Sequence, residues 1–270
     1  MRDELGDRMK KNYENRTRIL LPRRTYSIIR VDGKAFHTYT RGCERPFDEG
    51  LIADMNATAE YLCKNIQGAK IGFVQSDEIS ILMTDFDNLQ TDAWFDGNIQ
   101  KIVSVAASMA TSKFNQLRLA RHFREKFGYD EPTKVRFSIN DQIFSTKLAE
   151  FDARTFTIPS KTEVMNYFIW RQQDTVRNSI SSVAQTLYSS KELHGKNMSE
   201  QQEMIFDKGI NWNDYDSTLK RGRFVFKEKY EIESEKVKGE MFERSRWVTR
   251  ACPTFTAEPL FLDLYIPEIE

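Results

Sequence analysis

Residues 70–84 read KIGFVQSDEISILMT, a pattern that predicts two β-strands joined by a tight turn. Apolar side chains alternate along the second half of this stretch, as they do on a strand with one buried face. The turn falls near Ser76, which places the carboxyl groups of Asp77 and Glu78 at the tip of a hairpin. The rest of the fold is predicted around this hairpin.

A second acidic residue, Asp32, follows another β-type run in residues 28–34, which read IIRVDGK. An isolated Asp-Gly or Asp-Glu pair is more often only a turn, because short motifs have many chance matches. Carboxylates on two neighbouring strand ends are more informative, because they can hold two Mg²⁺ ions about 3.5–4 Å apart and promote phosphoryl transfer. Gly33 has no Cβ, so its backbone can approach a metal ion or a phosphate closely. We therefore predict Asp32 and Asp77 as metal ligands.

The remaining pattern predicts the fold class. Apolar residues at helical spacing predict one helix after Asp48, its expected N-cap, and another from about Asn98. Strands are expected at 25–31 and 134–139 in addition to the hairpin. The resulting order, β-α-β-β-α-β, is typical of an α+β, ferredoxin-like fold with an antiparallel sheet and helices on one face.

Residues 1–150 are expected to form this core, and residues 151–270 to complete the same domain as a helical and β-arm extension. Capping patterns that begin at Ser160 and Ser199 predict a long helix and a shorter one. A strand or hairpin arm is expected at 223–234. The C-terminal tail contains three prolines, which favour extended chain over helix.

Composition limits the setting of the protein. The 270 residues include 40 Lys and Arg and 40 Asp and Glu, so the net charge is zero. This argues against a protein that binds nucleic acid over a generally basic surface, but not against a local basic patch. Three scattered cysteines suggest neither a disulfide framework nor a zinc site. The charged N-terminus lacks the apolar segment of a signal peptide, and no apolar run reaches the roughly 20 residues of a membrane span. We expect a cytoplasmic protein with no membrane association.

Basic residues near the acidic sites are candidate phosphate contacts. Lys34 and His37 follow Asp32, and Arg45 lies in the next loop. Lys101 falls in the first turn of the second helix, where backbone N–H groups also favour anions. Each of these side chains, taken singly, is more often a solvated surface charge.

The polar cluster in residues 170–174, WRQQD, lies on the long helix, where it could line an active site or a subunit contact, or only face solvent. Residues 221–223 form a basic turn that could touch an RNA backbone, although an exposed loop is the simpler interpretation.

These stretches together resemble the tRNA-His guanylyltransferase family, including its Thg1-like branch of 3′–5′ RNA polymerases of bacterial and phage type. The likeness runs over roughly residues 5–230 and follows the family's order. The matching segments are RVDGKAFH (30–37), RPFD (45–48), QSDE (75–78), FDAR (151–154), PS (159–160), WRQQD (170–174) and RG (221–222).

The resemblance implies a fold similar to the palm of ordinary polymerases, with two Mg²⁺ ions held by the carboxylates of Asp32 and Asp77 and by the carbonyl of Gly33. Glu78 belongs to the same motif and ranks below the two aspartates as a catalytic residue. Arg45 stands where the family usually has Lys, and the two side chains bind phosphate with different geometry. The nucleotide- and triphosphate-binding residues implied are Gly33, Lys34, Ala35, Phe36, His37, Arg45, Asp48, Ser76, Lys101 and Asn178.

The family reaction activates a 5′-monophosphorylated tRNA with a nucleoside triphosphate, typically ATP, and then adds an incoming nucleotide, typically GTP, at the 5′ end. Family members are usually homotetramers. One departure concerns residues 176–179, VRNS, where eukaryotic members carry His-Ile-Asn-Asn and only Asn178 matches. The expected function is therefore template-directed repair of the tRNA 5′ end by a metal-dependent nucleotidyltransferase.

Three other functions remain open from the sequence. The first is addition of a single guanosine at the −1 position of tRNA-His. The second is a nucleotide cyclase-like palm enzyme, which would leave the WRQQD helix without a role. The third is an RNA-binding module without catalysis, against which the intact metal-ligand candidates argue.

Overall fold

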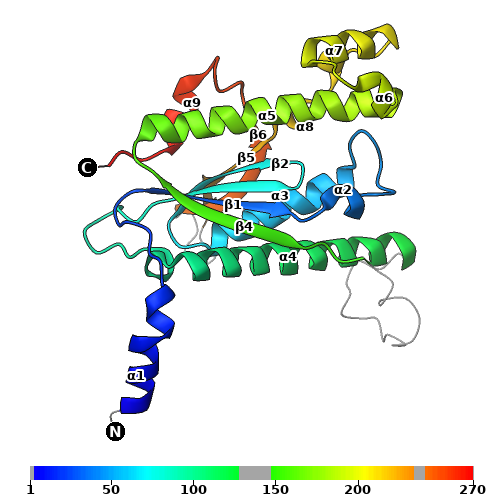
Figure 1. Cartoon of the computed structure of the whole chain (residues 1–270). Coiled ribbons are helices and arrows are strands. Elements are labelled where there is room, and N and C mark those ends of the chain that lie inside the picture. Colours follow the sequence, from blue (N-terminus) through cyan, green and yellow to red (C-terminus); the bar gives the residue numbers. More distant parts are fainter. Residues whose placement is uncertain (1–2, 128–146, 234–240, 270) are drawn as a thin grey trace.

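The computed structural model describes residues 3–127, 147–233 and 241–269. Within these ranges the centre of the molecule is a six-stranded antiparallel sheet in the order β4-β1-β3-β2-β5-β6 (Figure 1). The strands are β1 (Tyr26–Gly33), β2 (Ala69–Gln75), β3 (Glu78–Met83), β4 (Phe151–Ile158), β5 (Arg223–Glu233) and β6 (Met241–Ala251).

The predicted hairpin is confirmed as β2 and β3. Gln75 pairs with Glu78, which leaves Ser76 and Asp77 as the two-residue connection. Ser76 adopts a positive φ of 43°, which is uncommon for a residue with a side chain and is found in tight hairpin turns. Strand β1 lies on the other side of β3, with Asp32 opposite Glu78. The two acidic sites therefore meet at one end of the sheet, as expected.

Helices α3 (Glu49–Asn65) and α4 (Ile99–Phe127) cover one face of the sheet. Asp48 caps α3 as predicted, because its carboxylate accepts a hydrogen bond of 2.7 Å from the backbone N–H of Leu51. Between these helices and the sheet lies an apolar core that includes Val31, Ile79 and Phe114. The described residues up to 127 therefore have the predicted order β-α-β-β-α in their main strands and helices.

Helix α5 (Lys161–Leu187), part of the predicted C-terminal extension, covers the opposite face, so the arrangement with helices on one face holds for α3 and α4 and not for the whole domain (Figure 1). The physical reason is the alternation along the strands. Ile28 and Phe73 point away from the α3–α4 layer and need an apolar partner, which Phe168 of α5 supplies together with the C-terminal segment. Ser160 caps α5, because its hydroxyl accepts a hydrogen bond from the backbone N–H of Glu163.

The C-terminal tail is helical where extended chain was expected. Pro259 begins α9 (Pro259–Tyr265), a position where proline is tolerated because its missing N–H would have no partner inside the helix. The shorter helix, α7 (Met198–Asp207), is capped by Asn197 and Glu200 and not by the pair at Ser199 that the sequence suggested. The predicted strand at 134–139 lies outside the described residues, and β4 is the strand that pairs with β1.

The remaining elements lie around this frame. They are α1 (Glu4–Asn12), α2 (Phe36–Tyr39), α6 (Ser190–Leu193), α8 (Ser217–Arg221) and the short 3-10 turns Glu14–Thr17, Trp94–Gly97 and Trp212–Asp214. Helix α1 extends away from the body of the protein (Figure 1). In the part of the chain that the structure describes, no helix is both long enough and apolar enough to span a bilayer.

Candidate active site

Asp32, Gly33 and Asp77 lie together at one end of the sheet, where β1 ends and the β2–β3 hairpin turns. The N–H of Gly33 donates a hydrogen bond of 3.2 Å to the backbone carbonyl of Asp77. A Cβ added at Gly33 would lie 2.9 Å from Oδ2 of Asp77 and 2.3 Å from the ring of Phe36. The predicted need for glycine at this position is therefore steric, because any side chain would collide with the acidic site.

The two aspartates create a local excess of negative charge. The pKa of Asp77 is raised to about 6, mainly by burial; a hydrogen bond from the Ser76 side chain acts in the opposite direction, and the charges of Asp32 and Glu78 contribute to the rise. Asp32 is 38% exposed, and its nearest cation is Arg154, whose Nη2 lies 3.8 Å from Oδ2. A buried carboxylate beside a second carboxylate is stabilised by a bound cation, so the residues present fit the predicted metal site.

The metal ligands that this site offers are too few to complete the coordination of an ion without substrate. Among the described residues no group of three or more His, Cys, Asp or Glu side chains is arranged to hold a metal. Mg²⁺ commonly uses one or two carboxylates and completes its coordination with water and substrate phosphates. A site made of Asp32, Asp77 and nearby backbone therefore suits Mg²⁺ carried with a nucleotide better than a permanently held metal.

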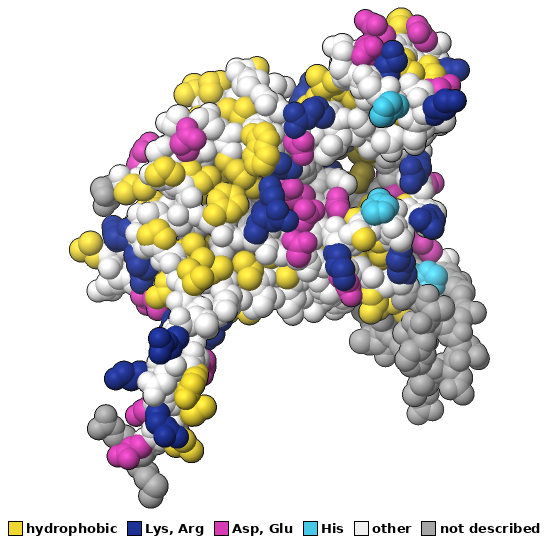
Figure 2. All heavy atoms as spheres, in the orientation of Figure 1, with side chains coloured by type: hydrophobic (Ala, Val, Ile, Leu, Met, Phe, Trp, Pro, Cys, Tyr) yellow, Lys and Arg dark blue, Asp and Glu magenta, His cyan; other side chains and the backbone are white. Residues whose placement is uncertain are grey.

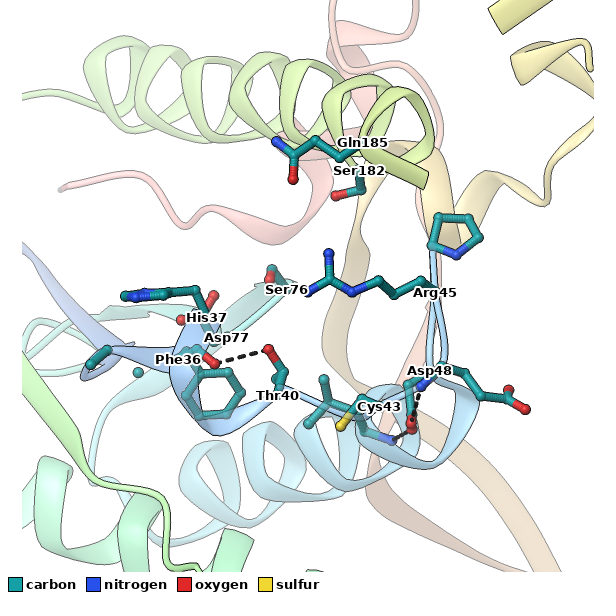
Figure 3. A pocket seen from close by; sticks show the side chains of 15 residues that line it. Phe36, His37, Thr40, Cys43, Arg45, Asp48, Ser76, Asp77, Ser182 and Gln185 are labelled. Atoms are coloured by element: carbon teal, nitrogen blue, oxygen red, sulfur yellow. Dashed lines mark hydrogen bonds between the residues drawn. The ribbon is translucent and has the colours of Figure 1, made fainter. Parts of the chain in front are cut away.

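A cavity of about 500 Å³ opens on one side of Asp77, between α2 and the end of α5 (Figure 3). Arg45 extends into this cavity toward Ser76, and His37 lies on the opposite side of it (Figure 3). The sequence-predicted residues that line it are Gly33, Ala35, Phe36, His37, Arg45, Asp48, Ser76 and Asp77. The structure thus brings most of the predicted nucleotide-binding residues together.

The start of α2 gives this cavity donors for an anion. Ala35 has a left-handed conformation, with φ of 50°, and the chain turns there from β1 into the helix. Phe36 and His37, at the start of α2, line the cavity, and the first backbone N–H groups of a helix lack acceptors within it. Together with the Arg45 guanidinium they form a surface suited to phosphate groups.

A second cavity of about 320 Å³ opens on the other side of Asp77, beneath α5. Asp32, Glu78, Arg171, Asp174 and Asn178 are among the residues that line it. The two cavities share four residues, namely Ser76, Asp77, Ser182 and Gln185. Asp77 therefore borders both cavities.

Glu78 has a different environment from the aspartates. Both of its carboxylate oxygens accept hydrogen bonds of 2.8 Å, from Nε and Nη2 of Arg171 on α5. Arg171 also donates to Asp174 at 2.9 Å. Glu78 thus ties α5 to the end of the sheet through Arg171, and it also lines the second cavity, so its predicted catalytic role stays a prediction.

Two predicted phosphate contacts lie elsewhere. Lys34 is exposed and pairs with Glu150 at 2.6 Å. Lys101 lies at the opposite end of the sheet, where its neighbour Ile102 lines a small cavity with Ser27. Ser27 is five strand residues from Asp32, roughly 17 Å. Because β3 runs away from the hairpin tip, the helix that follows it must begin at the far end, so one chain does not bring Lys101 to the site.

Ser182 and Gln185 line both cavities and were not predicted. Their sequence signal is a polar stripe on α5, because Asp174, Asn178, Ser182 and Gln185 recur at helical spacing. Asn178, which was predicted, lies on the same stripe. The stripe is the part of α5 that overhangs the acidic site.

Comparisons with known proteins agree with this geometry. The sequence model of the tRNAHis guanylyltransferase (Thg1) family matches residues 6–159, more than half of the chain. A solved bacterial tRNA(His) guanylyltransferase (Thg1)-like protein in complex with ATP is 42% identical with a TM-score of 0.79, over 98% of this chain and 99% of that one. A structure of such a bacterial protein in complex with GTP is also 42% identical, with a TM-score of 0.74 over 97% and 99%.

Among curated proteins, the tRNA(His) guanylyltransferase of Saccharomyces cerevisiae is 28% identical over 221 residues, which are 77% of this chain and 84% of the yeast protein. The matched family region contains Asp32, Asp77, Gly33 at the end of β1 and the turn into α2. The chain belongs to the tRNAHis guanylyltransferase family and is a nucleotidyltransferase.

Proposed function

We propose that this protein is a Mg²⁺-dependent 3′–5′ nucleotidyltransferase that repairs the 5′ end of tRNA with template-directed nucleotides. The observation that carries the proposal is the position of Asp77, beside Asp32 and between two cavities that share its side chain. The ATP and GTP complexes of the bacterial relatives support nucleoside triphosphates as substrates. The order of strands and helices supports a palm-like catalytic core in residues 1–150.

The cavity beside α2 is the proposed site of the nucleoside triphosphate. Arg45, His37 and the first amides of α2 would hold its phosphates, and Asp48 shapes the wall by accepting hydrogen bonds from the N–H groups of Glu44 and Leu51. Asp32, Asp77 and the backbone of Gly33 would hold Mg²⁺. Bound Mg²⁺ would neutralise charge that develops on the phosphoryl oxygens during transfer.

The second cavity is the proposed site of the RNA 5′ end. In the activation step an oxygen of the RNA 5′-phosphate attacks the α-phosphorus of ATP, and pyrophosphate leaves. In the addition step the 3′-hydroxyl of the incoming nucleotide attacks the activated 5′-phosphorus, gives up its proton, and AMP leaves. The protein acts mainly by positioning these groups, because phosphoryl transfer needs little covalent participation of side chains.

Addition of one guanosine to tRNA-His is the second candidate function. The names of several curated relatives favour it. The VRNS sequence at 176–179 favours the repair function, because it retains only one residue of the eukaryotic motif. We further propose a homotetramer that acts in the cytoplasm, in line with the family resemblance.

The deciding experiment uses a 5′-monophosphorylated tRNA that lacks its first nucleotide, with Mg²⁺, ATP and all four nucleoside triphosphates. Repair predicts addition of the nucleotide that pairs with the opposite base, and the choice should change when that base is changed. Guanosine added whatever the opposite base would support the tRNA-His function instead. Absence of any extension, with nucleotide still bound, would refute both.

A further inference from the structure

Trp170 is an exposed aromatic residue held in a fixed orientation beside the acidic site. Its side chain is 46% exposed. The guanidinium of Arg171 lies 4.4 Å from the centre of its ring, and Tyr167 meets the ring edge-on at 5.9 Å. Arg171 is itself bound to Glu78, the residue next to Asp77. The Trp170 ring is therefore held next to the acidic site by its contact with Arg171, which binds Glu78.

Two arginines lie on the same face of the sheet and oppose each other. Arg30 of β1 and Arg154 of β4 are direct cross-strand partners. Like charges in this position are unfavourable, and the carboxylates of Asp152 at 3.4 Å and Asp32 at 3.8 Å from Arg154 offset only part of this repulsion. Nε of Arg30 is buried and has no hydrogen-bond partner among the described residues, since the nearest carboxylate oxygen, on Glu78, is 3.9 Å away. An acceptor with negative charge between the arginines would satisfy both features.

The next step along the strands repeats the pattern with the opposite sign, because Asp32 and Asp152 are also direct partners. Figure 2 shows this order on the surface, with hydrophobic side chains over α5 and β4, then a band of Lys and Arg, then a band of Asp and Glu beside a hollow. An exposed apolar surface, the pair of arginines and the acidic site thus follow one another across a single face.

We propose that Trp170 is a stacking platform for the terminal base of the RNA 5′ end, and that Arg30 and Arg154 bind the adjoining backbone phosphate. The inference rests on the proposed function, because it describes how the RNA reaches the second cavity. Aromatic rings and arginines are the common means by which proteins bind unpaired nucleotides, because every base has a face that stacks.

Substitution of Trp170 separates stacking from simple burial. Trp170→Leu keeps an apolar side chain but cannot stack, so KM for the truncated tRNA should rise roughly 5- to 100-fold. Trp170→Phe should recover most of the affinity. Phe206→Leu, which changes an exposed aromatic residue on α7, is the matched control and should leave KM unchanged. The affinity for ATP alone should be the same in all four proteins.

Two further measurements keep the test independent of catalysis. Titration with the tRNA should quench intrinsic tryptophan fluorescence, and the Trp170 part of the quenching should be missing in Trp170→Phe although that variant still binds. Arg154→Gln should weaken binding equally for different RNA sequences and lower the slope of log affinity against log salt by roughly 0.7–0.9, the value of one phosphate contact.

Three results would overturn the inference. One is an unchanged KM for tRNA in Trp170→Leu. The second is a raised KM for the nucleoside triphosphate only, which would assign the surface to free nucleotide. The third is a changed assembly size in sedimentation with tRNA affinity intact, which would make the surface a subunit contact. A wild-type protein that never extends RNA would refute the proposed function separately, while the fluorescence titration would still test the platform.

Discussion

Replacing Asp77 by Asn should abolish nucleotide addition and yet make the metal-free protein more stable. Burial raises the pKa of Asp77 from 3.8 to about 6 in the folded protein. Each tenfold change in proton affinity corresponds to about 1.4 kcal/mol, so ionised Asp77 destabilises the folded state by at most about 3 kcal/mol. Asparagine has a similar shape and no charge, and therefore avoids this cost.

The effect should depend on pH in a defined direction. Below about pH 4 the carboxyl group is protonated in both states and has no cost. As pH rises toward 6 the unfolded chain ionises first, so the wild-type protein loses stability relative to Asp77→Asn. At pH 8 the difference is full and should raise the melting temperature of the variant by at most roughly 6–12 °C, because 1 kcal/mol corresponds to about 2–4 °C in a protein of this size.

Thermal melts from pH 4.5 to 8, in EDTA and in Mg²⁺, measure this difference. Mg²⁺ should stabilise wild-type protein and have little effect on Asp77→Asn. The matched control is Asp152→Asn, an exposed carboxylate opposite Asp32, which should change the melting temperature by less than about 2 °C. A variant less stable than wild type at pH 8 in EDTA, or a difference that does not change with pH, would refute the reasoning.

Three other substitutions test the site. Arg171→Met should destabilise the fold by about 3–5 kcal/mol in urea unfolding, because it leaves the Glu78 carboxylate buried without its partner, and Glu78→Met in the same chain should restore much of the loss. Gly33→Ala should reduce addition at least tenfold in single-turnover assays, since its Cβ would collide with Asp77 and the Phe36 ring; retained activity would show that the backbone can shift. Arg45→Ala should raise KM for the nucleotide roughly 10- to 100-fold, the value of a charged hydrogen bond, whereas Arg41→Ala, outside the cavity lining, should not.

The acidic site could be predicted from sequence because its parts are local. The alternation after Ser76 defines a strand, the two-residue connection places Asp77 at its tip, and the run before Asp32 defines the neighbouring strand. The order of elements then brings the two strand ends together. Family resemblance added the chemical role, and the turn into α2 and Arg45 do line one cavity with the acidic site.

The side-chain partners could not be predicted, because they depend on contacts between distant segments. Glu78 and Asp77 are adjacent in the sequence, yet Glu78 binds Arg171, 93 residues later, whereas Asp77 faces the cavities. Lys101 begins a helix, but only the direction of β3 decides that this helix starts far from Asp77.

The sequence by itself therefore determined β1, β2 and β3, the hairpin tip and the meeting of Asp32 with Asp77, since periodicity and turn geometry act over a few neighbouring residues. The tertiary structure decided that α5 covers the second face of the sheet, that Glu78 is neutralised by Arg171, and that two cavities meet at Asp77. The physical reason is that burial, charge pairing and cavity shape belong to groups of residues that only the folded chain brings into contact.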